Sequence, residues 1–308
     1  MANYKRYGIA AATLAVILLT GQLMQLSSAQ KQANLADVKS MPLPVELRDI
    51  TLTAADGATI KTAALGSALP ASPSGALPEM SQDCKVKMQA VPKAAALVEL
   101  VLAAPCAPSE RVVIHHNGMM FAELTDPSGA LQVSVPALAE NAVFIASFAG
   151  GEGAVASTSV EDIALFDRAA VQMQGQLGIA LHAHEFGAGY DEAGHIWREA
   201  PGEIAKGAKG IAGFLLQLGD PTLESPLMAE VYSFPTGFAK QLGTVALSVD
   251  IEITSANCGK DIEAQTLQTS RGQQITVQTL DMSMPGCEAA GDFLMLKNLV
   301  NDMKVAFN

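Results

Sequence analysis

The sequence of 308 residues is poor in charged and aromatic side chains. Charged residues make up 16% of it, against about 25% in an average globular domain. The net charge is -12 and no run of Lys or Arg follows Arg6. Phosphate binding needs clustered basic side chains, so a nucleic-acid partner is excluded. Aromatic residues make up 5%, and Trp197 is the only tryptophan, which argues against a stacking platform for bases or sugars.

Motifs of the common enzyme classes are also missing. The sequence has no G-x-S-x-G, no Walker A motif, no H-E-x-x-H and no G-x-G-x-x-G placed between a strand and a helix. These absences favour a protein without catalytic residues. No N-x-[ST] sequon occurs either, which favours a bacterial periplasm over a eukaryotic secretory route.

Residues 1–29 direct the chain to export. A basic start without acidic residues precedes an apolar stretch, and Ser27 and Ala29 follow in the small-x-small spacing of a cleavage site. Two interpretations remain open. Ile9–Gly21 has the length of a signal-peptide core, whereas Ile9–Leu26 reaches the length of a signal anchor. The basic end would stay in the cytoplasm, with the body across the inner membrane.

The four cysteines fit export. An even number on the oxidising side of a membrane predicts two disulfides. The simplest of the three pairings joins sequence neighbours, Cys84 with Cys106 and Cys258 with Cys287. Each would contribute about 3–4 kcal/mol in the chain-entropy model. A metal site of cysteines is disfavoured because no C-x-x-C spacing occurs.

The chain reads as a mainly β protein, with two antiparallel β-sandwich-like domains after an N-terminal hydrophobic helix and a Pro-rich linker. Residues 30–83 are the stalk and the Pro/Ser/Gly-rich linker, with a short hairpin expected at Asp56–Gly57. Residues 84–168 form the first domain, because short strands alternate with turns there. Residues 169–308 form the second β-rich domain. Its clearest strand is "GTVALSVDIEIT", whose apolar and polar residues alternate.

Three segments carry further expectations. "RVVIHHNGMMFAEL" predicts a hairpin with Asn117–Gly118 at its turn. His115 and His116 beside this turn point to opposite faces and are expected to be solvated. The Gly-rich segment 199–221 is expected to be a long loop with one short helix. The segment "DFLMLKNLVNDMKVAF" at 292–307 suits a core element, either helix or strand.

The run "VVIHHNGMMFAELTDPSGALQVSVPAL" at 112–138 resembles carboxypeptidase-regulatory-like or transthyretin-like sandwiches, in which a strand and an NG turn lead to "TD..G" and another strand. The resemblance implies a fold and not an activity.

His182, His184 and His195 are the candidate metal ligands. On a strand, His182 and His184 share a face at about 6–7 Å, which suits two ligands of one ion. A hairpin through "FGAGYDEAG" would return His195 to this pair. Three imidazoles can form an open zinc or copper site, with an oxygen from Glu185, Asp191 or Glu192. The alternative is that the three are ordinary histidines on a partly exposed strand and loop.

The same stretch resembles copper–zinc superoxide dismutases, which carry "H-V-H-E-F-G" on a strand and then "A-G-x-H". The resemblance implies that His182 and His184 bind copper and that His195 bridges copper and zinc. The sequence departs from that family in several ways. The intervening loop is shorter and lacks a cysteine, no histidine follows His195, and no arginine matches near "SANCGKD".

Two functions are therefore carried forward. The first is a non-enzymatic periplasmic, membrane-associated envelope protein, an interaction or assembly module with an envelope partner and without a cofactor. In overall plan the chain resembles exported proteins of Gram-negative bacteria. The alternative is a superoxide-dismutase-like protein that binds copper or zinc through the His-x-His strand.

Overall fold

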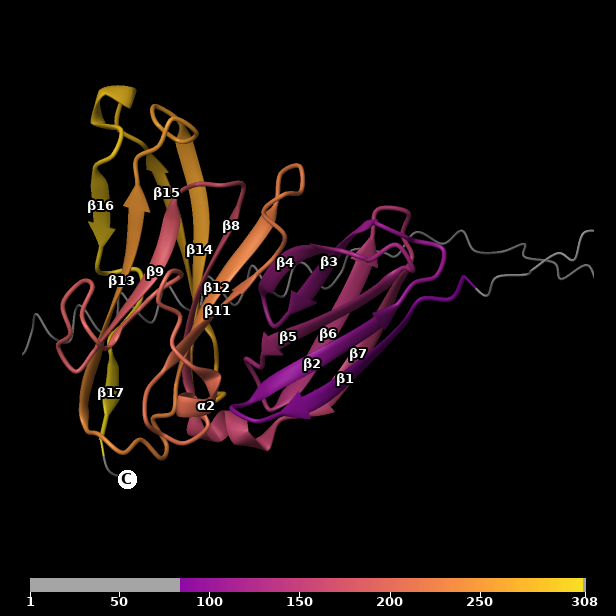
Figure 1. Cartoon of the computed structure of the whole chain (residues 1–308), viewed down its shortest axis with the longest axis horizontal. Coiled ribbons are helices and arrows are strands. Elements are labelled where there is room, and N and C mark those ends of the chain that lie inside the picture. The colour runs from indigo at the N-terminus through magenta and orange to yellow at the C-terminus, as the bar shows by residue number, and fades with distance from the viewer. Residues whose placement is uncertain (1–83, 307–308) are drawn as a thin grey trace, which may run out of the picture. The chain divides into compact units, whose positions relative to one another are not determined.

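The computed structural model describes residues 84–306, which are mainly β (Figure 1). Within this range all strand pairs are antiparallel and helical structure is limited to short segments. The predicted mainly β class is thus confirmed for the described part. The N-terminal hydrophobic segment, the linker and the hairpin at Asp56–Gly57 lie outside it. Within 84–306, no helix has the length and apolar character needed to cross a bilayer.

The first half of the described chain builds two sheets around one core. Apolar side chains of both sheets meet there, among them Leu100, Ile114, Phe121 and Phe144, all at most 1% exposed. One sheet has the order β1-β2-β5 and the other β4-β3-β6-β7. The strands are β1 Lys87–Lys93, β2 Leu97–Ala103, β3 Arg111–His116, β4 Met119–Leu124, β5 Ala130–Pro136, β6 Asn141–Phe148 and β7 Gly153–Ser159.

The second half builds two further sheets around a second core. One sheet has the order β11-β12-β8-β14-β15, and the other β10-β9-β13-β16 with β17 also paired to β13. The strands are β8 Asp167–Gln174, β9 Ile179–Glu185, β10 His195–Ile196, β11 Phe214–Leu218, β12 Leu227–Phe234, β13 Gly243–Glu252, β14 Asp261–Ser270, β15 Thr276–Ser283, β16 Phe293–Leu296 and β17 Met303–Val305. The short helices are η2 Glu161–Leu165, α2 Ile204–Gly207 and η3 Cys287–Ala289.

Local turn chemistry explains two of the turns in the first half of the described chain. The predicted hairpin forms between β3 and β4, because Asn117 and Gly118 both adopt positive φ, at 49° and 89°, as a type I′ turn requires. The next turn is fixed by Asp126, whose carboxylate accepts hydrogen bonds from the backbone of Ser128 and Ala130. Gly129 closes it at φ 78°, where a Cβ would meet the carbonyl of Ala104 at 1.9 Å.

Strand β8 is buried on both faces. Ala169 and Val171 belong to the second core, whereas Ala170 belongs to the first. Such a strand shows no alternation between polar and apolar residues, and it was not predicted. The predicted division of the chain at 168/169 falls within β8, and this domain boundary stays a prediction.

Arg168 of β8 reaches the first pair of sheets. Its guanidinium is fully buried and donates to the carbonyls of Ala95, Ala96 and Ala137. Ala95 and Ala96 both have positive φ, at 61° and 52°, so the connection between β1 and β2 turns its carbonyls toward the arginine. Both terminal nitrogens of this buried cation are thus paired, as its stabilisation requires, whereas Nε has no hydrogen-bond partner among residues 84–306.

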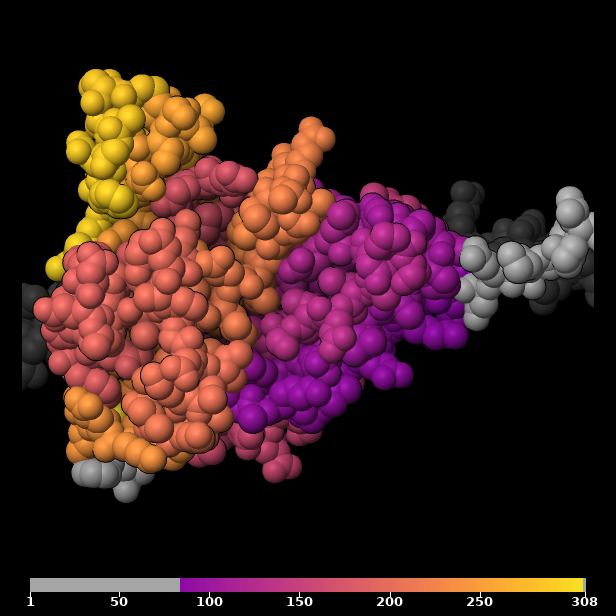
Figure 2. Space-filling model, viewed as in Figure 1, coloured from indigo at the N-terminus to yellow at the C-terminus, as the bar shows by residue number. Residues whose placement is uncertain are grey.

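Segment 199–221 was predicted incompletely. The expected short helix is α2, but the segment also contains β11, an edge strand whose Phe214 is fully buried. The glycines around β11 hid its short apolar run. In Figure 2 the orange connection between β11 and β12 projects from the surface. At the end of the chain the expected core element is two strands, and only β17 buries its apolar residues Met303 and Val305 fully in the second core. In β16, Phe293 and Met295 are 67% and 45% exposed.

The two predicted disulfides are present with the predicted pairing. Cys84–Cys106 ties the start of the described chain to the loop after β2, and Cys258–Cys287 ties the loop after β13 to η3. Two disulfides fit an oxidising compartment outside the cytoplasm.

Candidate functional site

The site lies on one face of the sheet β10-β9-β13-β16. Residues alternate along β9, so Leu181 and Ala183 enter the second core while His182 and His184 lie on the opposite face. The same alternation on β13 sends Val249 into the core and leaves Asp250 on the histidine face.

The predicted hairpin returns His195 to this face. Strand β10 pairs with β9 and places His195 directly opposite His184. Gly194 makes the return possible: it adopts φ 100°, and a Cβ there would lie 3.2 Å from the Cβ of Ala188 and 3.3 Å from the carbonyl of Glu185. The structure therefore brings together all three histidines selected from the sequence.

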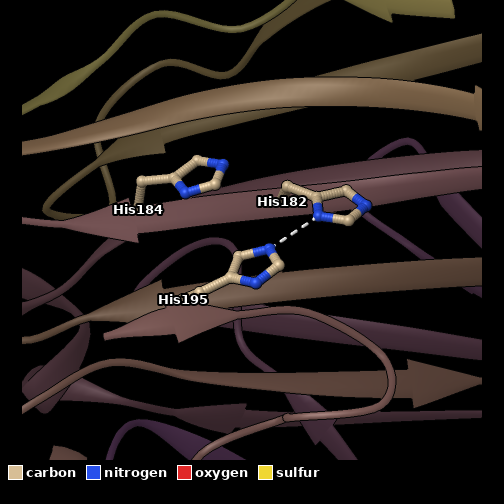
Figure 3. A group of neighbouring side chains, drawn as sticks. All are labelled: His182, His184 and His195. Atoms are coloured by element: carbon tan, nitrogen blue, oxygen red, sulfur yellow. Dashed lines mark hydrogen bonds between the residues drawn. The ribbon is translucent and has the colours of Figure 1, made fainter. Parts of the chain in front are cut away.

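Figure 3 shows the three imidazoles side by side. One ligand atom from each of His182, His184 and His195 lies within 4.8 Å of the others. His182 Nδ1 and His195 Nε2 are 2.8 Å apart and share a hydrogen bond. The rings of His184 and His195 are nearly parallel, with centroids 4.7 Å apart.

The hydrogen bonds assign the ring protons. The backbone N–H of Asp191 donates to His195 Nδ1 at 3.2 Å, so Nε2 carries the proton of neutral His195 and donates to His182 Nδ1. His184 Nδ1 lies 3.0 Å from the carbonyl of Ala188 and donates to it, because a carbonyl only accepts. The Nε2 lone pair of His184 remains available, in the orientation that backbone carbonyls give to metal-binding histidines.

Burial favours the neutral form of His182 and His195. His182 and His195 are 6% and 3% exposed. Burial lowers the pKa of His182 to about 4, although the charge of Asp250 opposes the shift. Burial also lowers the pKa of His195. Neutral imidazole is the form that binds metal ions.

Aromatic and acidic groups complete the surroundings. Trp197 stacks on His182 with centroids 5.0 Å apart. Tyr190, from the loop between β9 and β10, donates a hydrogen bond of 2.6 Å to Asp250 Oδ2. Burial and this bond raise the pKa of Tyr190 to about 12, so the phenol keeps its proton. A cavity of about 500 Å³ opens beside the histidines and is lined by His182, His195, Trp197, Asp250, Phe293 and Met295, among others.

Of the suggested oxygen ligands, Glu185 and Glu192 accept hydrogen bonds elsewhere, whereas Asp191 lies beside His195 and binds it through its backbone N–H. Glu185 follows the core-facing positions of β9, and its Oε1 accepts hydrogen bonds from Gly213 N and Tyr232 Oη at 2.7 and 2.8 Å. The proposal of Glu185 as a ligand is therefore wrong. Glu192 Oε2 accepts from the backbone of Gly189. No carboxylate of the described residues joins the three histidines within the same 4.8 Å.

Sequence reasoning missed Tyr190, Trp197 and Asp250. Asp250 was assigned to the polar face of a half-buried strand, yet it is 6% exposed, because the loop carrying Tyr190 covers it. A local signal existed for Trp197, which lies two residues after His195. None existed for Asp250, because its proximity depends on the pairing of β9 with β13.

His116 also differs from the prediction. It is 1% exposed and not solvated. Its Nδ1 lies 2.9 Å from the carbonyl of Val143, its Nε2 accepts from the backbone N–H of Leu138 at 2.8 Å, and its ring stacks on Phe144. These contacts make it a structural histidine.

No protein-family model matches this chain, and no curated protein is significantly similar to it. The resemblances to transthyretin-like sandwiches and to copper–zinc superoxide dismutases therefore stay predictions.

Proposed function

We propose that this protein is an exported envelope protein that binds one transition metal ion, zinc or copper, through His182, His184 and His195. The convergence of three ligand atoms within 4.8 Å, from two neighbouring strands, carries the proposal. Imidazole nitrogens suit both metals, and three protein ligands leave a position open for water or another molecule.

The residues fit such an ion after a rearrangement of the rings and a change of the His195 tautomer. Tetrahedral Zn–N bonds of about 2.0–2.1 Å separate two ligand nitrogens by roughly 3.3 Å. His182 Nδ1 and His195 Nε2 are 2.8 Å apart around a shared proton. An ion bound to both nitrogens would require the proton of neutral His195 to move from Nε2 to Nδ1, which ends the hydrogen bond from the Asp191 N–H, and the two nitrogens would separate by about 0.5 Å. The ligand atoms of the cluster, which lie within 4.8 Å of one another, would draw together to roughly 3.3 Å.

The proposal is for a single ion and for binding, not superoxide turnover. The remaining histidines of the chain are His115 and His116, and His116 is fixed in the first core. The chain therefore lacks the further histidines that the resemblance to copper–zinc dismutases requires.

The proposed location is the periplasm, with the body held at the inner membrane or released from it. The predicted export segment 1–29, the Pro-rich linker 30–83 and the two disulfides support it. In that location the histidine site would be exposed to the metal ions of the periplasm.

Elemental analysis of the exported protein, purified without a metal-binding tag, tests the metal proposal. We expect about one zinc or copper per chain after incubation with either ion. The metal should disappear in the double variant His182→Ala/His184→Ala and remain in His115→Ala, a matched surface control. Absence of metal in the wild type, or its retention in the double variant, would refute the site. A superoxide assay on the loaded protein tests the dismutase alternative directly.

The second candidate is an interaction or assembly module of the envelope. The outer face of the sheet β4-β3-β6-β7 favours it, since Val143, Ile145 and Val155 are 43%, 45% and 66% exposed there. Cross-linking in mild detergent should capture a partner with the wild type and lose it with Ile145→Lys. Capture that is equally strong with both proteins would remove the support that this face gives.

A further inference from the structure

The cavity beside the histidines has an apolar wall and an acidic wall. Phe293 and Met295 of β16 form an apolar wall and are 67% and 45% exposed. Asp250 lies on the neighbouring strand, directly opposite Met295. At about 500 Å³, the cavity has the size of a small-molecule pocket rather than of an ion site.

Asp250 is a buried carboxylate with an unused oxygen. Its Oδ2 accepts the hydrogen bond of Tyr190, but Oδ1 has no hydrogen-bond partner among residues 84–306. A buried acceptor without a partner costs about 1–3 kcal/mol. A hydrogen-bond donor from outside the described residues would therefore stabilise this carboxylate.

The charge around Asp250 is negative. Three more carboxylates line the cavity, those of Asp191, Glu199 and Glu252. The lining has one guanidinium, that of Arg198, which forms an ion pair of 2.9 Å with Glu230 and donates to the carbonyl of Ile179. Arg198 is thus engaged elsewhere, and the cavity favours a positively charged occupant.

We propose that this cavity binds a small organic cation, an amine with an apolar body, whose ammonium group donates to Asp250 Oδ1. The body would lie against Phe293 and Met295, and Trp197 would offer its ring to the cation. His182 and His195 form part of the wall, but binding of the amine requires no metal.

The single tryptophan provides the measurement. Trp197 lines the cavity, and the chain contains no other tryptophan, so its fluorescence reports on this place alone. The full chain in mild detergent with EDTA is titrated with phenethylamine. Phenethyl alcohol, which has the same body without the charge, is the matched control ligand.

We expect phenethylamine to bind at least tenfold more tightly than phenethyl alcohol. Asp250→Asn should lower the affinity for phenethylamine to that for phenethyl alcohol. Asp281→Asn, at an exposed acid on β15, should leave both affinities unchanged. Met295→Lys, at an exposed position that leaves the buried groups intact, should also abolish amine binding. Equal affinities for the two ligands, or an amine preference that survives both cavity variants, would overturn the proposal.

The amine site and the metal site can fail separately. His184 belongs to the metal cluster but does not line the cavity. His184→Ala should lose the metal and keep phenethylamine binding, while Asp250→Asn should lose the amine preference and keep one metal per chain.

Discussion

At the scale of single residues, His116 has a role opposite to that of the clustered histidines. Both of its ring nitrogens are used in hydrogen bonds to the backbone. Nδ1 donates to the carbonyl of Val143 and Nε2 accepts from the N–H of Leu138, so neither nitrogen is free to bind a metal ion. A second ring proton would break the bond to Leu138, so this histidine is held neutral. Burial lowers its pKa to about 4.

His116 predicts a pH dependence of stability. In the unfolded chain it takes up a proton below about pH 6.5, but in the folded chain only below about 4. The unfolded state binds more protons in this window, so the free energy of unfolding falls as the pH drops from 6.5 to 4. The shift corresponds to on the order of 3 kcal/mol.

Denaturant unfolding at several pH values measures this contribution. His116→Gln should be less stable at pH 7 and should show a flatter dependence between pH 6.5 and 4. His115→Gln, on the opposite face of β3, is the matched control. An equal flattening in both variants would contradict the assignment to His116.

At the scale of elements, the loop between β9 and β10 positions His195. Gly194→Ala adds a Cβ that meets Ala188 and Glu185, whereas Gly187→Ala, at a similar φ of 89°, meets nothing within 4 Å. Both substitutions strain the backbone by about 1 kcal/mol. The first alone should move His195 and weaken zinc binding, by roughly tenfold or about 1.4 kcal/mol. Calorimetric zinc titration of both variants would reveal the difference, and equal affinities would contradict it.

The same scale shows how far sequence reasoning reached. Strict alternation predicted β13, and turn chemistry predicted the β3–β4 hairpin. Spacing placed His182 and His184 on one face, and an expected hairpin offered the return of His195, with ordinary histidines as the alternative. Strands such as β8, buried on both faces, carry no alternation and were missed. Asp250 and Tyr190 stand 60 residues apart, and only the pairing of β9 with β13, which no local pattern encodes, brings them together.

Disulfide Cys258–Cys287 holds the segment that leads into the cavity wall on β16. It fixes η3, from which the chain continues into β16 and the apolar cavity wall. Its removal by Cys258→Ser/Cys287→Ser should lower stability by about 3–4 kcal/mol and weaken phenethylamine binding. Cys84→Ser/Cys106→Ser should lower stability to a similar degree and leave amine binding unchanged. Thermal unfolding and Trp197 fluorescence distinguish the two effects, and intact amine binding in the first variant would refute the link.

At the scale of the whole described unit, Arg168 connects the two cores. Arg168→Met would leave the carbonyls of Ala95, Ala96 and Ala137 without their donor. We expect a loss of about 3–5 kcal/mol in the free energy of unfolding. Arg111→Met, which removes a comparable side-chain bond to the exposed carbonyl of Glu224, should cost less than about 1 kcal/mol. Comparable losses in the two variants would argue against a special role for Arg168.

Strand β8 gives side chains to both cores, with Ala170 in the first and Val171 in the second. If either half unfolded, apolar surface of the other half would become exposed to water, so neither half keeps its full stabilisation alone. The described chain should therefore unfold in one cooperative step, with equal calorimetric and van't Hoff enthalpies. Within residues 84–306 a protease would then find either the folded form or the unfolded form, and the histidine site would persist for as long as the first core does.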